Sequence, residues 1–102
     1  MTFLSSAPLE THVAAPRYFR KLGIESAPLN EEEILFHAER QKFIMLNETA
    51  RFLWERLAEP HSSEELAHHL CESFASVTSG QALLDVETTL QKLQELEFVE
   101  RS

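Results

Sequence analysis

The hydrophobic pattern of this chain changes its period once, at Asn47. Before Asn47 the apolar side chains stand in short runs that suit β-strands. After it they recur every three to four residues, as on one face of an α-helix. Strands followed by a run of helices are typical of an α+β domain. A chain of 102 residues has room for one such domain, so we predict a single α+β domain with its strands in the first half.

The strands before the change of period differ in strength. Little repeats in residues 1–16, which we predict to form a flexible N-terminal segment, so that the folded domain spans residues 17–102. One short strand is expected within residues 17–25. Two stronger strands follow at residues 33–38 and 42–46, with a polar hairpin loop between them.

The last of these strands is apolar at four consecutive positions. Alternation places Phe43 and Met45 on one face of the strand and Ile44 and Leu46 on the other. A strand that is apolar on both faces needs cover on both, which either a helix of this domain or something from outside supplies. Lys42 is its only charge, so its backbone would be a template for another extended chain if the strand lies at a sheet edge.

Three helices are predicted after the change of period. Asn47 is a good N-cap for the first helix, and Pro60 ends it. Ser62 and Glu65 have the spacing of a capping box at the start of the second helix. Thr78 and Gln81 have the same spacing before the third helix, which spans about residues 79–96. The apolar stripes expected to form the core are Ala50, Leu53, Trp54 and Leu57, then Leu66, Ala67, Leu70, Cys71 and Phe74, then Leu83, Val86, Leu90 and Leu93, with Leu84 and Leu96 beside them.

Composition excludes several classes of function. There is no apolar run long enough to span a membrane and no secretory signal at the N-terminus. A single cysteine, Cys71, excludes an internal disulfide framework and indicates a cytoplasmic protein. Nine basic residues against 17 acidic ones give a net charge of −8, which argues against nucleic acid and membrane surfaces as partners.

No motif in the chain predicts catalysis, a cofactor or a metal. Glu65, His68 and Cys71 have helical spacing, and a metal-binding module through these three residues is one alternative that we consider. Metal sites of this kind need a second such motif or paired Cys/His knuckles, which the sequence lacks. We therefore predict that the chain is not an enzyme and has no metal ligands.

A winged-helix regulator that binds DNA or another protein is the alternative function. The three helices could form a helix-turn-helix, and the hairpin its wing. However, the third helix, which would read the bases, carries four acidic residues against Lys92 alone, and the second helix carries three acidic residues and no basic one. A phosphate backbone would repel both helices.

Two arrangements of the strand at residues 42–46 stay open at this point. The third helix either covers the strand fully or leaves an apolar trough beside it. In the second case an extended peptide could add to the edge of the sheet and place its side chains in the trough.

Three segments carry a resemblance to a known family. Residues 46–50, Leu-Asn-Glu-Thr-Ala, are followed by Phe-Leu-Trp-Glu-Arg-Leu at residues 52–57. The Ser-Ser-Glu-Glu-Leu-Ala-His-His-Leu run at residues 62–70 and the segment 85–96 continue the match. Over about residues 30–99 the chain resembles the PqqD-like family, the peptide chaperones of pyrroloquinoline quinone biosynthesis.

The resemblance implies a winged-helix-like fold of three strands and three helices that acts as a recognition element for ribosomally made, modified peptides. In such a domain the leader part of the precursor peptide adds as a strand beside the third strand and packs against the third helix. The bound peptide is presented to a modifying enzyme, often a radical S-adenosylmethionine (SAM) enzyme, which holds the catalytic cluster. The pathway stays open, as does a homodimer that exchanges edge strands.

The resemblance also names the residues expected to contact the peptide. They are Lys42, Phe43, Ile44, Met45 and Leu46 on the strand, and Asp85, Thr89, Lys92 and Leu96, beside Val86 and Leu93, on the third helix. This chain departs from the family in two places. Its N-terminal stretch is longer than the domain needs, and Glu-Arg-Gln at residues 39–41 replaces the usual glycine-rich turn.

Overall fold

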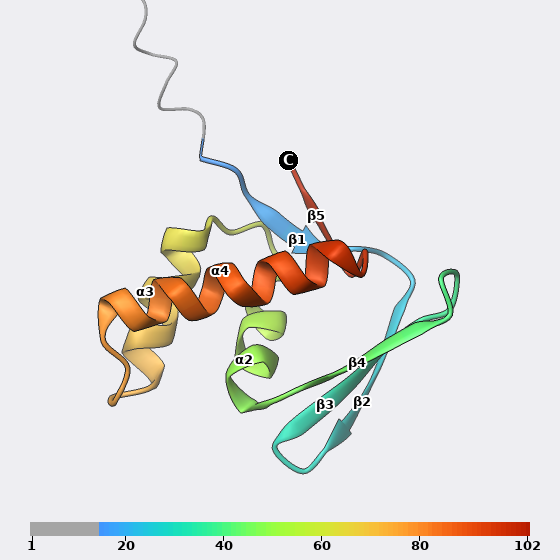
Figure 1. Ribbon diagram of the computed structural model, residues 1–102, viewed down its shortest axis with the longest axis horizontal. Helices are drawn as coiled ribbons and strands as arrows, with labels where there is room; N and C mark the ends of the chain where they lie inside the picture. Colours follow the sequence, from blue (N-terminus) through green and yellow to red (C-terminus); the bar gives the residue numbers. More distant parts are fainter. Residues whose placement is uncertain (1–14) are drawn as a thin grey trace, which may run out of the picture.

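The computed structural model describes residues 15–102, and there the strands precede the helices except for one last strand (Figure 1). The elements are β1 (Tyr18–Arg20), β2 (Ile24–Leu29), β3 (Glu32–His37), β4 (Lys42–Leu46), α2 (Glu48–Arg56), α3 (Ser63–Ser73), α4 (Ser79–Glu95) and β5 (Val99–Arg101). The predicted α+β class is confirmed. The predicted flexible segment, residues 1–16, lies outside the described residues except for its last two.

Strands β2, β3 and β4 form one antiparallel sheet in that order. The register of β3 and β4 places Leu35 opposite Ile44, and His37 opposite Lys42. The hairpin loops reverse the chain through left-handed residues, Asn30 at φ 60° and Gln41 at φ 53°. Asparagine tolerates this region better than most residues, so the β2–β3 turn is well encoded. Strand β4 stands at one edge of the sheet.

The structure differs from the expectation of one short strand within residues 17–25. That stretch contains β1 and the beginning of β2, separated by a turn at Gly23, whose φ of 84° suits glycine. Strand β1 leaves the hairpin sheet and pairs with β5 at the other end of the sequence, Tyr18 opposite Arg101. Strands of three residues carry too little periodicity to be recognised from the sequence.

The β1–β5 ribbon is attached to the end of α2 by Arg20. The Arg20 N–H donates to the carbonyl of Leu57 at 2.9 Å, and its Nε donates to the carbonyl of Trp54, also at 2.9 Å. The guanidinium lies 4.8 Å from the centre of the Trp54 ring, within the range of a cation–π interaction. Both ends of the described chain are thereby held against the helices.

The core contains most of the apolar stripes predicted for the three helices, closed by residues from the strands. Its buried members are Leu35, Leu46, Leu53, Trp54, Leu57, Leu66, Ala67, Leu70, Ala82, Val86, Leu90, Leu93, Phe98 and Val99. Ala50, Cys71 and Phe74 are only partly buried and pack against it. Helix α4 is rotated slightly from the prediction, because Ala82 is buried whereas Leu83 is only partly buried and Leu84 is exposed. No helix among residues 15–102 is both long and apolar enough to cross a membrane.

Each helix begins at the cap that the sequence predicts. The Asn47 side chain accepts from the Ala50 N–H at 2.9 Å. Ser62 and Glu65 form a full capping box, in which Ser62 Oγ accepts from the Glu65 N–H at 3.2 Å and Glu65 Oε1 accepts from the Ser62 N–H at 3.0 Å. The caps fix where α2 and α3 start and therefore the lengths of the connections between the helices.

Replacing Glu65 by glutamine should reduce the loss in free energy of unfolding that the domain shows as the pH falls below about 4.5. The hydrogen bond from the Ser62 N–H, with help from the Arg17 guanidinium, holds the pKa of Glu65 below its ordinary value of 4.5. A lowered pKa in the folded state stabilises the fold above pH 4.5, and this contribution is lost as the pH falls from 4.5 through the lowered value. In urea unfolding, Glu65→Gln should be less stable than the parent at neutral pH, and the difference should shrink in acid.

The matched control is Glu64→Gln, which makes the same change of charge one residue away and outside the capping box. A Glu65→Gln variant whose deficit in stability stays constant down to strong acid would contradict this role of the carboxylate.

Candidate functional site

The free edge of β4 is the first part of the site. Strand β4 pairs with β3 along one side, and no strand among residues 15–102 pairs along its other side. An edge of this kind presents a row of backbone N–H and C=O groups. Lys42 is the only charged residue on the strand, and the strand contains no proline that would block pairing.

A groove, which we call the edge groove, separates β4 from α4. It is lined by Ile44, Met45, Leu46, Asn47, Ala50, Thr88, Thr89, Lys92 and Leu93, and encloses about 220 Å³. Its floor is mostly apolar, and its α4 side carries hydroxyl groups and one lysine. Of the two arrangements that the sequence left open, the structure has the trough and not full coverage of the strand by the helix.

The edge groove continues past the end of β4 into a second hollow. This hollow, of about 390 Å³, is lined by Asn47, Thr49, Leu84, Asp85, Thr88 and Thr89. Three of these residues, Asn47, Thr88 and Thr89, also line the edge groove. The two hollows are therefore adjoining parts of one depression along α4.

The structure brings most of the predicted site residues to this depression. Ile44, Met45, Leu46, Thr89, Lys92 and Leu93 line the edge groove, and Asp85 lines its continuation. Lys42 and Phe43 are exposed on β4 outside the groove lining.

Two further predicted residues, on α4, do not line the depression either. Val86 is fully buried in the core, and Leu96 is partly buried and packs against it. Because α4 turns by about 100° per residue, Val86 faces the core although its neighbour Asp85 lines the depression. Val86 supports the helix from beneath and offers no surface to a ligand.

Three residues that line the edge groove were not predicted to do so from the sequence. Asn47 was assigned only to capping and Ala50 only to the core, while Thr88 was not singled out. The available signal was the pair of threonines at residues 88 and 89, small polar residues on a helix that is otherwise rich in leucine and charge. Small residues here leave the space that bulky ones would fill.

The face of the sheet that points away from the helices is a second exposed surface. On β4 it carries Phe43, 72% exposed, and Met45, 50% exposed. The register places Phe36 beside Phe43 and Ile34 beside Met45, and Phe36 is 38% exposed. Within residues 15–102 nothing covers this outer face, so the cover that the sequence pattern calls for is present on only one side of β4.

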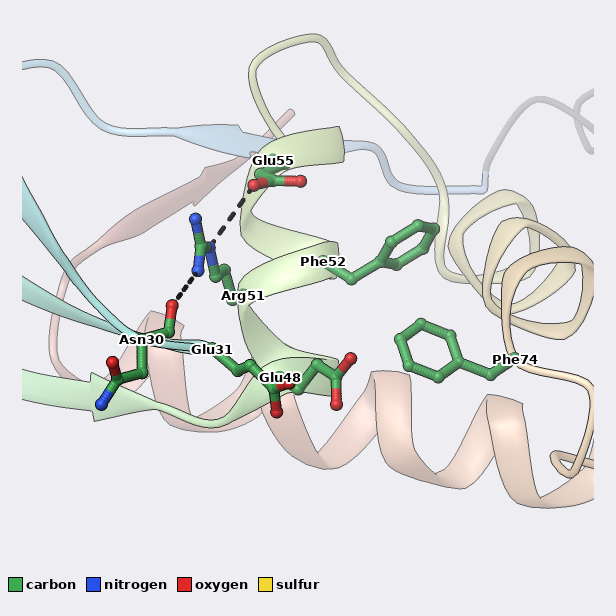
Figure 2. A pocket seen from close by; sticks show the side chains of 7 residues that line it. All are labelled: Asn30, Glu31, Glu48, Arg51, Phe52, Glu55 and Phe74. Carbon is green, nitrogen blue, oxygen red and sulfur yellow. Dashed lines mark hydrogen bonds and ion pairs between the residues drawn. The ribbon is translucent and has the colours of Figure 1, made fainter.

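Two ion-pair groups fix the hairpin sheet against the helices. Arg40, in the β3–β4 loop, lies 2.7 Å from Glu97, just after α4. Arg51 of α2 lies 3.4 Å from Glu33 and donates to the carbonyl of Asn30 at 2.9 Å. Figure 2 shows Arg51 between Asn30 and Glu55. These contacts join the hairpin sheet to α2 and to the turn that follows α4.

The hollow drawn in Figure 2 is a separate feature on the other side of α2. It encloses about 270 Å³ and is lined by Asn30, Glu31, Glu48, Arg51, Phe52, Glu55 and Phe74. Phe52 and Phe74 meet edge to face at 5.5 Å. The single arginine is already engaged by its neighbours, and the remaining charges are acidic, so this hollow has no free basic group for an anionic ligand.

The residues considered for a metal have other partners. Glu65 belongs to the capping box and pairs with Arg17 at 2.9 Å. His68 lies 3.2 Å from Glu72, and Cys71 packs partly against the core. In the part of the chain from residue 15 onward, no three His, Cys, Asp or Glu side chains gather closely enough to hold a metal ion.

Comparisons with known proteins agree on one family and one fold. Residues 32–99 match the family model described as coenzyme PQQ synthesis protein D (PqqD). Two solved structures have the same fold. TbiB1 in complex with the TbiA(beta) leader peptide has a TM-score of 0.71 and 23% identity, covering 80% of this chain and 94% of that one. A lasso peptide synthetase B1 complexed with the leader peptide has a TM-score of 0.69 and 22% identity, covering 81% of this chain and 96% of that one. No curated protein matches the chain.

Proposed function

The chain belongs to the PqqD family, and on that premise we propose that it is a non-catalytic chaperone that binds the leader region of a ribosomally made precursor peptide. The leader adds as a fourth strand along the free edge of β4 and lays alternate side chains into the edge groove. The two solved structures of the same fold were both obtained with a leader peptide bound, which supports this assignment.

The single observation that carries the proposal is the open edge of β4 beside a ready-made groove. In β-strand addition the backbone of the guest supplies affinity, and pockets for its alternate side chains supply specificity. Both parts occur together at β4, whereas β2, on the opposite edge of the same sheet, lines neither hollow of the depression.

A modifying enzyme is the second partner that we propose, with a radical SAM enzyme as the expected class. The exposed apolar outer face, with Phe36, Phe43 and Met45, supports a further protein contact, because soluble domains seldom leave such a patch unused. A guest strand on β4 would extend this same face, so that enzyme and peptide could meet on one continuous surface. We place these events in the cytoplasm, where ribosomes release the precursor.

The open edge of β4 could also pair with the β4 edge of a second copy, but such a homodimer would occupy the peptide site. Two copies with a net charge of −8 each also repel one another. We therefore propose the monomer as the form that binds the peptide, with self-pairing as a competitor at high concentration.

Titration with a leader peptide tests the proposal. ¹⁵N-labelled protein would be mixed with the synthetic leader of the precursor encoded beside its gene, and with the core region of the same precursor as the control. We expect amide shifts at residues 42–46 and along α4 near Thr88 and Lys92 with the leader, and none with the core region. Shifts that leave these two segments unchanged would overturn the proposal.

A further inference from the structure

We propose that the edge groove reads the direction of its guest by charge. This proposal rests on the proposed function. The bound peptide is a strand with a basic, an apolar and an acidic residue at positions i, i+2 and i+4. This strand runs antiparallel to β4, with its basic end near Asp85 and its acidic end near Lys92.

Strand β4 and helix α4 run in opposite directions along the groove. The first residue of β4 to reach the groove, Ile44, shares its lining with Lys92 near the end of the helix, and Asn47, just after β4, shares the second hollow with Asp85. The ion pair between Arg40 and Glu97 joins the β3–β4 loop to the turn that follows the C-terminal end of α4. Figure 1 shows the same arrangement, with the hairpin loop lying toward the red end of α4.

The two ends of the depression carry opposite charges. At the hairpin end, Lys42 and Lys92 are both exposed, and neither has an ion-pair partner among residues 15–102. At the other end Asp85 accepts a hydrogen bond from Gln81 Nε2 at 2.8 Å, and no cation described in the structure pairs with it.

Two other cations close to β4 are already paired. Arg40 is paired with Glu97, and Arg51 is paired with Glu33 and Glu55. Lys42 and Lys92 therefore carry positive charge that no ion pair among residues 15–102 neutralises, on a chain whose net charge is −8. A peptide of complementary charge would be attracted electrostatically at both ends of the depression, and a peptide with the charges reversed would be repelled at both.

The middle of the groove suits an apolar side chain. Ile44, Ala50 and Leu93 contribute hydrocarbon to a hollow of about 220 Å³. Charged or amide groups there would lose water without a matching charge, so the central groove-facing position of the guest is apolar.

The spacing of the charges sets the spacing in the guest. Lys92 lies seven positions after Asp85, which is about 10 Å along a helix axis. Positions i and i+4 of a strand lie on the same face about 13 Å apart, and the flexible lysine side chain covers the difference. We choose the antiparallel direction because every pair in this sheet is antiparallel and such pairs are slightly more stable.

Three synthetic peptides test the inference: Ac-TKVLVET-NH2, its charge-reversed form Ac-TEVLVKT-NH2, and the neutral Ac-TQVLVQT-NH2. Affinity is measured by amide-shift titration of the full chain at low ionic strength. We expect the first peptide to bind about tenfold more tightly than the second, with the neutral one between, because two favourable ion pairs replace two repulsions. At about 1 M salt, where charges interact over only about 3 Å, the three should converge.

The double variant Asp85→Lys with Lys92→Glu keeps the net charge and should invert the preference. A matched control, Glu64→Lys with Arg101→Glu, exchanges two exposed charges away from the groove and should leave the preference unchanged. Equal affinities for the charged peptides, a preference for the reversed peptide, a preference that the double variant does not invert, or no binding of the first peptide would each overturn the inference.

The two proposals fail in different ways. If the precursor's leader shifts residues 42–46 while the synthetic peptides are not discriminated, the charge reading is wrong and the chaperone function stands. If the leader leaves those residues unchanged, both proposals fall.

Discussion

Replacing Met45 by proline should weaken leader-peptide binding by at least one order of magnitude while the chain stays folded. His37 and Lys42 close the β3–β4 loop, and we expect that pair to exchange hydrogen bonds. Because bonded and non-bonded pairs alternate along an antiparallel ladder, the amide of Met45 then points to the free edge. Proline there removes a donor to the guest, at a cost of about 1–3 kcal/mol, and sets its ring against the incoming backbone.

The neighbouring variant, Ile44→Pro, is the matched control. The same alternation points the Ile44 amide toward β3, so this proline breaks the sheet's own ladder and should lower stability. Circular dichroism and urea unfolding check the fold, and the leader titration checks binding. A folded Met45→Pro protein with unchanged affinity would count against strand addition at this edge.

The largest effect on stability is expected from Phe98→Ala. Phe98 is fully buried and follows directly on the turn that ends α4, and its ring lies 5.7 Å from that of His37 on β3. Its carbonyl accepts from the Lys21 N–H at 3.0 Å, and its N–H donates to the Leu93 carbonyl at 2.8 Å. Truncating a buried phenylalanine typically costs about 3–5 kcal/mol, a large part of the 5–15 kcal/mol that stabilises a typical domain.

Phe43→Ala is the control for this loss, since it removes the same side chain from a position that is 72% exposed. Its effect on the free energy of unfolding should stay within about 0.5 kcal/mol. Urea unfolding of the two variants measures both values. If they lose stability equally, the packing of Phe98 between the sheet and the helices does not hold the domain together as described.

The position of Phe98 also matters for the peptide site. The residue contacts β3, the end of α4 and the turn after β1, and β3 pairs with β4, which borders the edge groove. A variant that loosens these contacts would widen or close the edge groove. Peptide binding should therefore fall in Phe98→Ala even under conditions in which the variant is still folded.

Local signals allowed much of the fold to be predicted. Asn47, Ser62 and Thr78 cap the helices where the pattern places them, because a cap depends on residues only three positions apart. Alternation placed Ile44 and Leu46 on one face of the strand and Phe43 and Met45 on the other, and the structure shows the first pair to be the more buried one. The family resemblance over about residues 30–99 agrees with the matched range of 32–99.

Strand pairings between distant parts of the chain could not be predicted from the sequence. Nothing near Tyr18 indicates that its strand would pair with Arg101, because strand pairing is set by tertiary contacts and short strands have weak periodicity. The rotation of α4 was also off at its start, where Ala82 and not Leu84 is buried. Helix rotation is decided by what packs against the helix, and a leucine-rich segment offers several possible faces.

The sequence by itself determined the elements: an apolar strand followed by three capped helices, with an acidic surface that disfavours nucleic acid. Only the tertiary structure decided that β4 stands at an open edge, that α4 lies beside it at the distance of a groove, and that Lys92 and Asp85 face opposite ends of that groove. The reason is physical: periodicity and capping act over a few neighbouring residues, whereas an open edge and a groove exist only between segments that folding brings together.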